Sequence, residues 1–161
     1  MRTLTPTADL PRLSHQKARE VMSPHPETVR PGASVQEAAA RMRAFDIGFL
    51  PVVTPGEVCG VVTDRDLVTR VTGSGRCARS TTVGDIMTAD VISCDPESSL
   101  ESAVQWMAIM QIRRMVVLGK NRLLLGVISL ADLIRAGHEA EAHLVYGVSR
   151  VSAGPYWSRR R

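Results

Sequence analysis

The sequence has few aromatic residues, few cysteines and no long apolar run, and each shortage excludes a class of protein. Aromatic side chains make up 4% of the 161 residues, which leaves little to stack the bases of single-stranded nucleic acid. The three cysteines form no CxxC pair, a pattern that fits free thiols in a reducing compartment. The longest mostly apolar stretch, residues 123–130, is far shorter than the ~20 residues that span a bilayer. The N-terminus lacks the apolar core of a signal peptide, so we expect a cytoplasmic protein.

The sequence also lacks the short motifs that mark common catalytic and metal sites. It contains no GxSxG, HExxH, GxxxxGK[ST] or GxGxxG, and we therefore predict that it is not an enzyme and requires no cofactor. Glu139 and His143 have i,i+4 spacing on a predicted helix, and this pair could ligate a metal ion. Because no further ligands are evident nearby, a solvated helix face is the favoured interpretation, and we predict no metal site.

The excess of positive charge lies at the two ends of the chain. The net charge is +4, and residues 1–20 and 136–161 each contribute +2, whereas residues 21–135 carry equal numbers of basic and acidic side chains. A protein that binds nucleic acid usually presents a basic face across its folded body. The balanced body therefore disfavours a nucleic-acid partner.

The most informative feature of the sequence is an internal repeat. Val21-Met22 recurs as Ile86-Met87 at an offset of 65 residues, and Gly60-Val61-Val62-Thr63 recurs as Gly126-Val127-Ile128-Ser129 at an offset of 66. The repeat divides the chain into an N-terminal extension (1–20), a first unit (21–71), a connector (72–85), a second unit (86–136) and a C-terminal helix or tail (137–161).

Each unit has the same predicted plan, a short extended segment followed by a helix, two strands and a second helix. Ser34 and Glu37 have the spacing of a capping box before the first helix, as do Ser98 and Glu101 in the second unit. One such unit is too small to cover both faces of its sheet. We therefore predict an α+β fold in which two β-α-β-β-α units pack sheet to sheet with pseudo-two-fold symmetry. The expected extended segments are 27–30 and 91–95. The expected helices are 34–46, a second one from Ser98 or Ser99 to about Gln111, and later ones from 64 and 130. The expected strands are 49–53, 57–63, 115–118 and 123–129.

The two copies of the closing motif, GVVTDRD (60–66) and GVISLAD (126–132), resemble those of paired CBS domains, also called a Bateman module. Each unit also has the Met near its start (VMSP, DIMT) and the Pro before the first helix (RPGAS, DPESS) that mark this family. The short two-unit form is similar to stand-alone bacterial and archaeal members such as hypoxic response proteins. The resemblance implies a regulatory protein, expected as a homodimer, that binds AMP, ADP or ATP between its units and signals to a separate protein partner.

The motif Thr63-x-x-Asp66, repeated as Ser129-x-x-Asp132, has two interpretations. It has the spacing of a helix capping box, and this structural role explains the residue types at either copy alone. The same helix start would present N–H groups and a positive dipole end to a phosphate. The resemblance implies this second role, with the hydroxyl near phosphate and the carboxylate on the ribose hydroxyls. A protein in which the motifs only cap helices would be a ligand-independent interaction module, and this alternative stays open.

The resemblance also implies contacts to the adenine base. It places a backbone and hydroxyl contact at Thr28 and Ser93, and an apolar lid at the entry to the second strand of each unit. In the second unit Val116 replaces the Pro that is usual in the family. The implied lid residues are Phe49, Leu50 and Pro51 in the first unit and Met115 with Val116 in the second.

Three arginines distinguish the two units. Arg113 and Arg114 stand where the first unit has Gly48 and Phe49, and Arg65 follows Thr63 where the second unit has Ala131. Because the guanidinium fork bonds two phosphate oxygens at once, we hypothesise that these arginines give the cleft a local positive potential. Solvated surface side chains or salt bridges are the competing interpretation.

Overall fold

The computed structural model describes residues 16–55 and 57–136. Both predicted units form, and the mixed α+β architecture is confirmed. Residues 1–15 of the predicted N-terminal extension (1–20) and the whole predicted C-terminal segment 137–161, including Glu139 and His143, lie outside the described residues. The elements are α1 (Ala18–Val21), β1 (Ser23–Pro24), α2 (Val35–Ala44), β2 (Phe49–Thr54), β3 (Glu57–Thr63), α3 (Asp64–Arg70), the 3-10 turn η1 (Thr72–Ser74), β4 (Ser93–Cys94), α4 (Leu100–Met110), β5 (Arg114–Leu118), the 3-10 turn η2 (Lys120–Arg122), β6 (Leu124–Ser129) and α5 (Leu130–Ala136).

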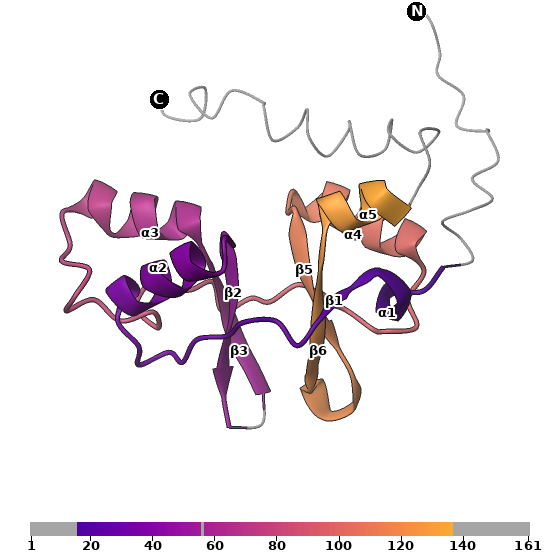
Figure 1. Ribbon diagram of the computed structural model, residues 1–161, viewed down its shortest axis with the longest axis horizontal. Coiled ribbons are helices and arrows are strands. Elements are labelled where there is room, and N and C mark those ends of the chain that lie inside the picture. The colour runs from indigo at the N-terminus through magenta and orange to yellow at the C-terminus, as the bar shows by residue number, and fades with distance from the viewer. Residues whose placement is uncertain (1–15, 56, 137–161) are drawn as a thin grey trace, which may run out of the picture.

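The chain forms two lobes with their sheets at the centre and their helices on the outer flanks (Figure 1). The first lobe contains α2, β2, β3 and α3, and its antiparallel hairpin pairs Phe49 with Thr63. The second lobe contains α4, β5, β6 and α5, and its sheet has the order β1-β6-β5-β4. A shared core between the sheets, built around Val58, Val116 and Val127, confirms that the two units pack sheet to sheet.

The segment that opens each repeat packs on the lobe of the other repeat. Strand β1, at the start of the first repeat, pairs antiparallel with β6 of the second lobe, where Ser23 lies opposite Val127. In the same way Thr88, at the start of the second repeat, exchanges two backbone hydrogen bonds with Val61 of β3. The buried side chains follow this exchange, because Ala18 belongs to the core of the second lobe and Ile86 to the core of the first. The repeats therefore interlock.

The first glycine of each closing motif makes room for this exchange. A Cβ atom on Gly60 would lie 2.5 Å from the Met87 sulfur, and one on Gly126 would lie 2.7 Å from the Met22 sulfur and 2.8 Å from the carbonyl oxygen of Ser23. Separations below about 3 Å do not occur between such atoms without displacement. The Met near the start of each repeat therefore packs on the first Gly of the closing motif of the other repeat.

Two local predictions differ from the structure. The cap of α4 is Ser99, whose hydroxyl accepts a hydrogen bond from the backbone N–H of Ser102, so the predicted Ser98–Glu101 capping box is wrong. Ser34 does cap α2, accepting from the N–H of Glu37. The predicted extended segment at 27–30 forms no strand and makes a single parallel bridge, in which Val29 pairs with Val52.

We predict that Gly126→Ala lowers the free energy of unfolding by about 1–3 kcal/mol, the usual cost of overpacking a closed site. The added methyl group meets the backbone carbonyl of Ser23 as well as the Met22 side chain, and the backbone cannot rotate away. Gly32→Ala is the matched control, since no atom lies within 4 Å of its Cβ position. Urea unfolding of both variants measures the difference, and equal stabilities would contradict the packing role of Gly126.

Candidate functional site

A cleft of about 570 Å³ opens between the two lobes at the end of β3. This volume lies within the range of small-molecule sites, which is roughly 300–1,000 Å³. The start of α3 supplies one side, the beginning of β5 supplies the opposite side, and the segment 88–92 that follows the exchanged Met87 supplies part of the lining. Six residues predicted from the sequence line it, namely Phe49, Thr63, Arg65, Asp66, Arg113 and Arg114.

Thr63 and Asp66 form a complete capping box at the start of α3. One carboxylate oxygen of Asp66, Oδ2, accepts hydrogen bonds from the Thr63 N–H at 2.9 Å and from the Thr63 hydroxyl at 2.7 Å. The Thr63 hydroxyl in turn accepts from the Asp66 N–H at 3.2 Å. The capping role predicted from the spacing is therefore present, and only Oδ1 of Asp66 lies outside the box.

The first N–H groups of α3 are all occupied, contrary to the expectation that they are free for phosphate. The Asp64 N–H donates to the carbonyl of Gly48 at 3.3 Å, and the Arg65 N–H donates to the Asp64 carboxylate at 2.7 Å. The Asp66 N–H is used by the Thr63 hydroxyl. A phosphate at this end of the cleft would therefore depend on side chains rather than on the helix backbone.

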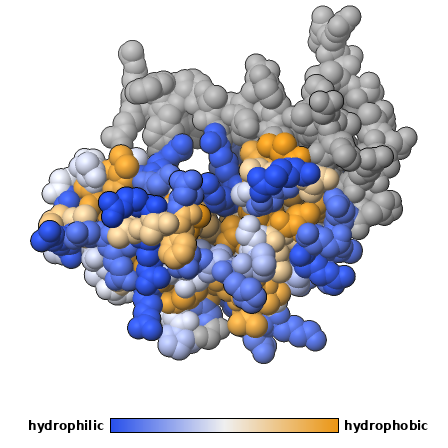
Figure 2. Space-filling model, viewed as in Figure 1, coloured by the Kyte–Doolittle hydropathy of each residue, from blue (hydrophilic) through white to orange (hydrophobic). Residues whose placement is uncertain are grey.

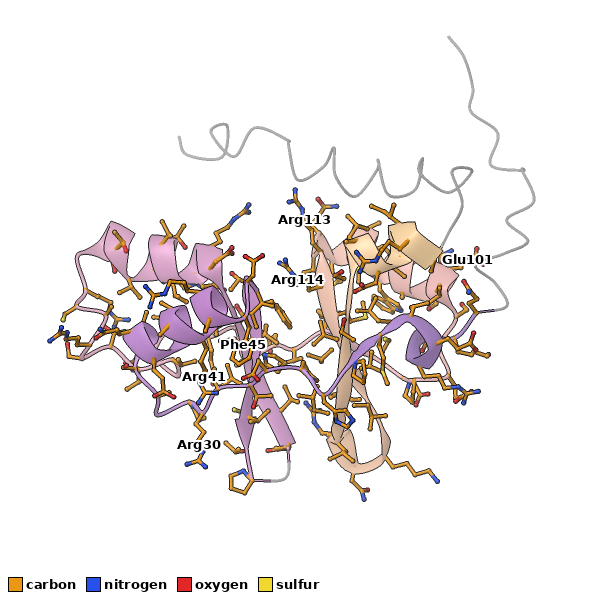
Figure 3. The ribbon with its side chains drawn as sticks, viewed as in Figure 1. Arg30, Arg41, Phe45, Glu101, Arg113 and Arg114 are labelled. Carbon is orange, nitrogen blue, oxygen red and sulfur yellow. The ribbon has the colours of Figure 1, made fainter. Side chains whose placement is uncertain are left out.

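The charged side chains of the cleft balance in number. Figure 3 shows Arg113 and Arg114 at the start of β5, beside the space between the lobes, and Arg65 lies on α3 across the cleft. The cleft also contains the carboxylates of Asp64, Asp66 and Asp90, so its lining carries no net excess of positive charge. Among the described residues no ion pair joins any of these three arginines to a carboxylate, which leaves their guanidinium groups available to an anion.

The second copy of the motif has the same local geometry in different surroundings. Asp132 Oδ2 accepts from the Ser129 N–H at 2.7 Å and from its hydroxyl at 2.6 Å, and the carboxylate pairs with Arg135. Neither Ser129 nor Asp132 lines the cleft described above. The residues equivalent to Arg113, Arg114 and Arg65 in the other repeat are Gly48, Phe49 and Ala131, and none of them is charged.

A third box with the same geometry lies in the connector, at Thr82 and Asp85. The Asp85 carboxylate accepts from the Thr82 N–H at 2.9 Å and from its hydroxyl at 2.8 Å. This Thr-x-x-Asp was not predicted to form a box, because no apolar strand precedes it. Since neither residue lines the cleft, box geometry by itself does not distinguish a binding site from a helix or turn cap.

Several residues implied by the family resemblance lie away from this cleft. Leu50 and Met115 are fully buried in the cores of the first and second lobes, and Pro51 and Val116 are buried as well. Thr28 is half-buried beside β2, and Ser93 is exposed on β4. The alternation of side chains along a strand sends Phe49 to the cleft and its neighbour Leu50 to the core.

Four polar residues of the cleft were not found from the sequence: Asp64, Thr88, Asp90 and Gln111. Thr88 and Asp90 reach the cleft only because the opening segment of the second repeat crosses to the first lobe. Asp64 is placed by Gly48, where a Cβ atom would lie 2.5 Å from its carboxylate oxygen. The glycine at position 48, where the other repeat has Arg113, was the sequence feature that could have indicated this close approach of Asp64.

Comparison with known families identifies the fold. The CBS domain model matches residues 18–73 and 83–139, once for each repeat. The chain belongs to the CBS domain family. Its CBS domain pair is 39% identical over 115 residues to the CBS domain-containing protein YhcV of Bacillus subtilis, covering 71% of this chain and 81% of the relative.

Two further similarities concern proteins with solved structures. Hypoxic response protein 1 of Mycobacterium tuberculosis is 29% identical over 119 residues, covering 73% of this chain and 82% of the relative. A crystal structure of Hypoxic Response Protein I, with two coordinated zinc ions, has a TM-score of 0.68 at 29% identity over 74% of this chain and 98% of that one. The CBS domain pair of protein MJ0100, in complex with 5-methylthioadenosine and S-adenosyl-L-methionine, has a TM-score of 0.68 at 23% identity, covering 74% of this chain and 94% of that one, and shows the fold alone.

Within residues 16–55 and 57–136 no three His, Cys, Asp or Glu side chains group as metal ligands. In the same ranges, no helix has the length and apolar character needed to cross a bilayer.

We predict that the connector box contributes to stability in a pH-dependent way. Hydrogen bonds from the Thr82 N–H and hydroxyl lower the pKa of Asp85 below its ordinary value of 3.8. A carboxylate with a lowered folded-state pKa stabilises the fold above its unfolded pKa, and this contribution disappears as the pH falls through the folded value. Asp85→Asn should therefore be less stable than the wild type at neutral pH, with a difference that shrinks below pH 3.8.

Urea unfolding midpoints near neutral and at about pH 3 measure this difference, with Asp90→Asn as an exposed control. A deficit in Asp85→Asn that is independent of pH would contradict the ionised box.

Proposed function

We propose that this CBS domain pair is a regulatory protein that binds an adenine nucleotide, AMP, ADP or ATP, in the cleft between its lobes. The observation that carries the proposal is the convergence in one cleft of a carboxylate at a helix start, unpaired arginines from the opposite lobe and an apolar wall. Each part matches one portion of a nucleotide. The proposal includes no catalytic role and no required cofactor.

The ribose would bind at Asp66. Its Oδ1 faces away from the capping box, and a carboxylate oxygen of this kind accepts hydrogen bonds from ribose hydroxyls in other nucleotide sites. The phosphates would lie against Arg113 and Arg114, because the helix N–H groups of α3 are already used. The base would contact the apolar side chains of Phe49, Ile92 and Ile112, which line the same cleft.

Binding would act on the arrangement of the two lobes. Arg65 and Asp66 belong to the first lobe and Arg113 and Arg114 to the second, so a ligand that contacts both sets favours one relative position. A ligand shifts such an equilibrium by no more than its difference in affinity for the two states. The change would be transmitted to a separate protein partner through the outer surface of the lobes.

A second candidate function has an observation of its own in its favour. The motif residues form capping boxes like that of Thr82 and Asp85, which lie outside the cleft. If all three only cap, the protein is a ligand-independent interaction module. In that case Asp66→Ala would cost about 0.5–2 kcal/mol of stability, as cap losses do, with no effect on any ligand.

Calorimetric titration of ligand-stripped protein with AMP, ADP and ATP separates the two candidates. We predict that the wild type binds at least one of them and that Asp66→Ala abolishes measurable binding in this cleft. Asp132→Ala is the matched control, because it removes the equivalent capping carboxylate outside the cleft and should leave that binding intact. No binding of any nucleotide by the wild type would leave only the interaction module.

We also propose that the protein is a homodimer that associates through the helices of the second lobe. Helix α4 has apolar side chains at its surface as well as in the core: Leu100, Val104 and Met107 are buried in the lobe, whereas Trp106 and Ile109 are exposed. Exposed apolar patches of this kind mark protein contact surfaces. Figure 2 shows hydrophobic residues at the surface of this lobe.

We predict that Ile109→Glu, at a side chain that is 70% exposed, dissociates the dimer because it places a charge within an apolar contact. Leu123→Glu is the control, at a residue that is 58% exposed beside the hairpin turn. Sedimentation equilibrium of the wild type and both variants measures the mass. A dimer unaffected by Ile109→Glu would place the contact elsewhere.

A further inference from the structure

Asp66 has one carboxylate oxygen outside its capping box, and Arg70 holds that oxygen. Arg70 lies one turn further along α3, and its Nη2 lies 3.2 Å from Asp66 Oδ1. A carboxylate offers about four acceptor positions. The two Thr63 hydrogen bonds use Oδ2 and Arg70 forms an ion pair with Oδ1, so the acceptor capacity that remains for a ligand lies mainly on Oδ1.

The same guanidinium also contacts the segment that enters from the second repeat. Arg70 Nη1 donates to the backbone carbonyl of Ile86 at 2.5 Å, and Nη2 donates to the hydroxyl of Thr88 at 3.2 Å. Ile86 is buried in the core of the first lobe, and Thr88 lines the cleft. Arg70 thus joins the carboxylate of the first repeat to the exchanged segment of the second.

The second repeat does not reproduce this link. The position equivalent to Arg70 is Ala136, at the offset of 66 residues. Asp132 is paired instead with Arg135, whose side chain is 70% exposed. Among the described residues Arg135 makes no hydrogen bond to β1 or to α1, the elements that open the first repeat. The two copies of the motif therefore differ in their connection to the rest of the molecule, although their capping geometry is the same.

We propose that Arg70 is a positioning residue that fixes Asp66 Oδ1 for the ribose and couples occupation of the cleft to the exchanged segment 86–88. This inference rests on the proposed function. The planar guanidinium can bond the carboxylate and the Ile86 carbonyl at once, because its donors have a fixed fork geometry. A ligand that restrains Asp66 consequently restrains the segment that interlocks the repeats.

The test compares two variants. Arg70→Met removes the ion pair with Asp66, and the control Arg135→Met removes the corresponding ion pair with Asp132. Calorimetry with AMP and with 2′-deoxy-AMP reports the ribose contact separately from the phosphate and base contacts. We expect Arg70→Met to bind AMP about tenfold more weakly, as for the loss of one charged hydrogen bond. Its preference for AMP over 2′-deoxy-AMP should fall by a similar factor, whereas Arg135→Met should keep the wild-type affinity and preference.

Hydrogen exchange supplies the second readout. AMP should slow exchange of the Met87 and Thr88 amides in the wild type and in Arg135→Met but not in Arg70→Met. If Arg70→Met fails to fold, Arg70→Lys serves in its place, because an ammonium group retains the charge without the fork. A folded variant at position 70 with the wild-type preference and protection would overturn the role of Arg70, and so would an equal loss in Arg135→Met. Failure of the wild type to bind any nucleotide would instead overturn the proposed function itself.

Discussion

The exchange of opening segments between the two repeats is the contact on which the rest of the structure depends. Met22 lies on Gly126 and Met87 lies on Gly60, so each closing motif receives its methionine from the other repeat. The strand pairs Ser23–Val127 and Val61–Thr88 continue this contact along the backbone. The lobes are joined twice, at pseudo-symmetric positions, and the shared core of Val58, Val116 and Val127 fills the space between their sheets.

The cleft is a consequence of the same exchange. Thr88 and Asp90 reach it because the chain crosses from the core of the first lobe toward β4 of the second after Met87. Arg113 and Arg114 reach it because β5 begins beside the end of β3 when the sheets are packed together. No single repeat contains the set of groups that a nucleotide requires, and a ligand held there contacts both lobes by necessity.

The three Ser/Thr-x-x-Asp boxes of the described residues share one capping geometry, so the geometry alone does not identify a binding site. Their hydrogen bonds have nearly the same lengths at Thr63, Thr82 and Ser129. What differs is the environment of the carboxylate. Only Asp66 combines a box with a position in the cleft between the lobes and a link through Arg70 to the other repeat. Each box stabilises the start of a helix or a turn, and the ligand contact proposed for Asp66 rests on its surroundings rather than on the box.

Most of the local structure could be predicted from the sequence, because the signals for it are local. Helix positions followed from helical periodicity, strand positions from runs of Val, Ile and Leu bounded by turn residues, and the repeat at Gly60 and Gly126 predicted two related units. The exchange could not be predicted, since it is a contact between segments far apart in the chain. The occupied N–H group of Asp64 was missed for a similar reason, because the carbonyl of Gly48 that accepts from it is brought there by the fold.

Among the cleft residues, those with a local sequence signal were predicted and those placed by distant contacts were not. Thr63 and Asp66 carry a motif, and the arginines were found by comparing one repeat with the other. Asp90 has no such signal, because its place depends on where the chain runs after the exchange. Leu50 and Phe49 were assigned to the same lid, and the strand separates them by sending alternate side chains to opposite faces.

Crystal structures of the ligand-stripped protein grown separately with AMP, ADP and ATP test most directly where a nucleotide binds. We expect at least one of them between the lobes, with its ribose hydroxyls on Asp66 and its phosphates against Arg113 and Arg114. A cleft beside Asp66 that stays empty with all three, or a nucleotide bound only beside Asp132, would contradict the proposed site.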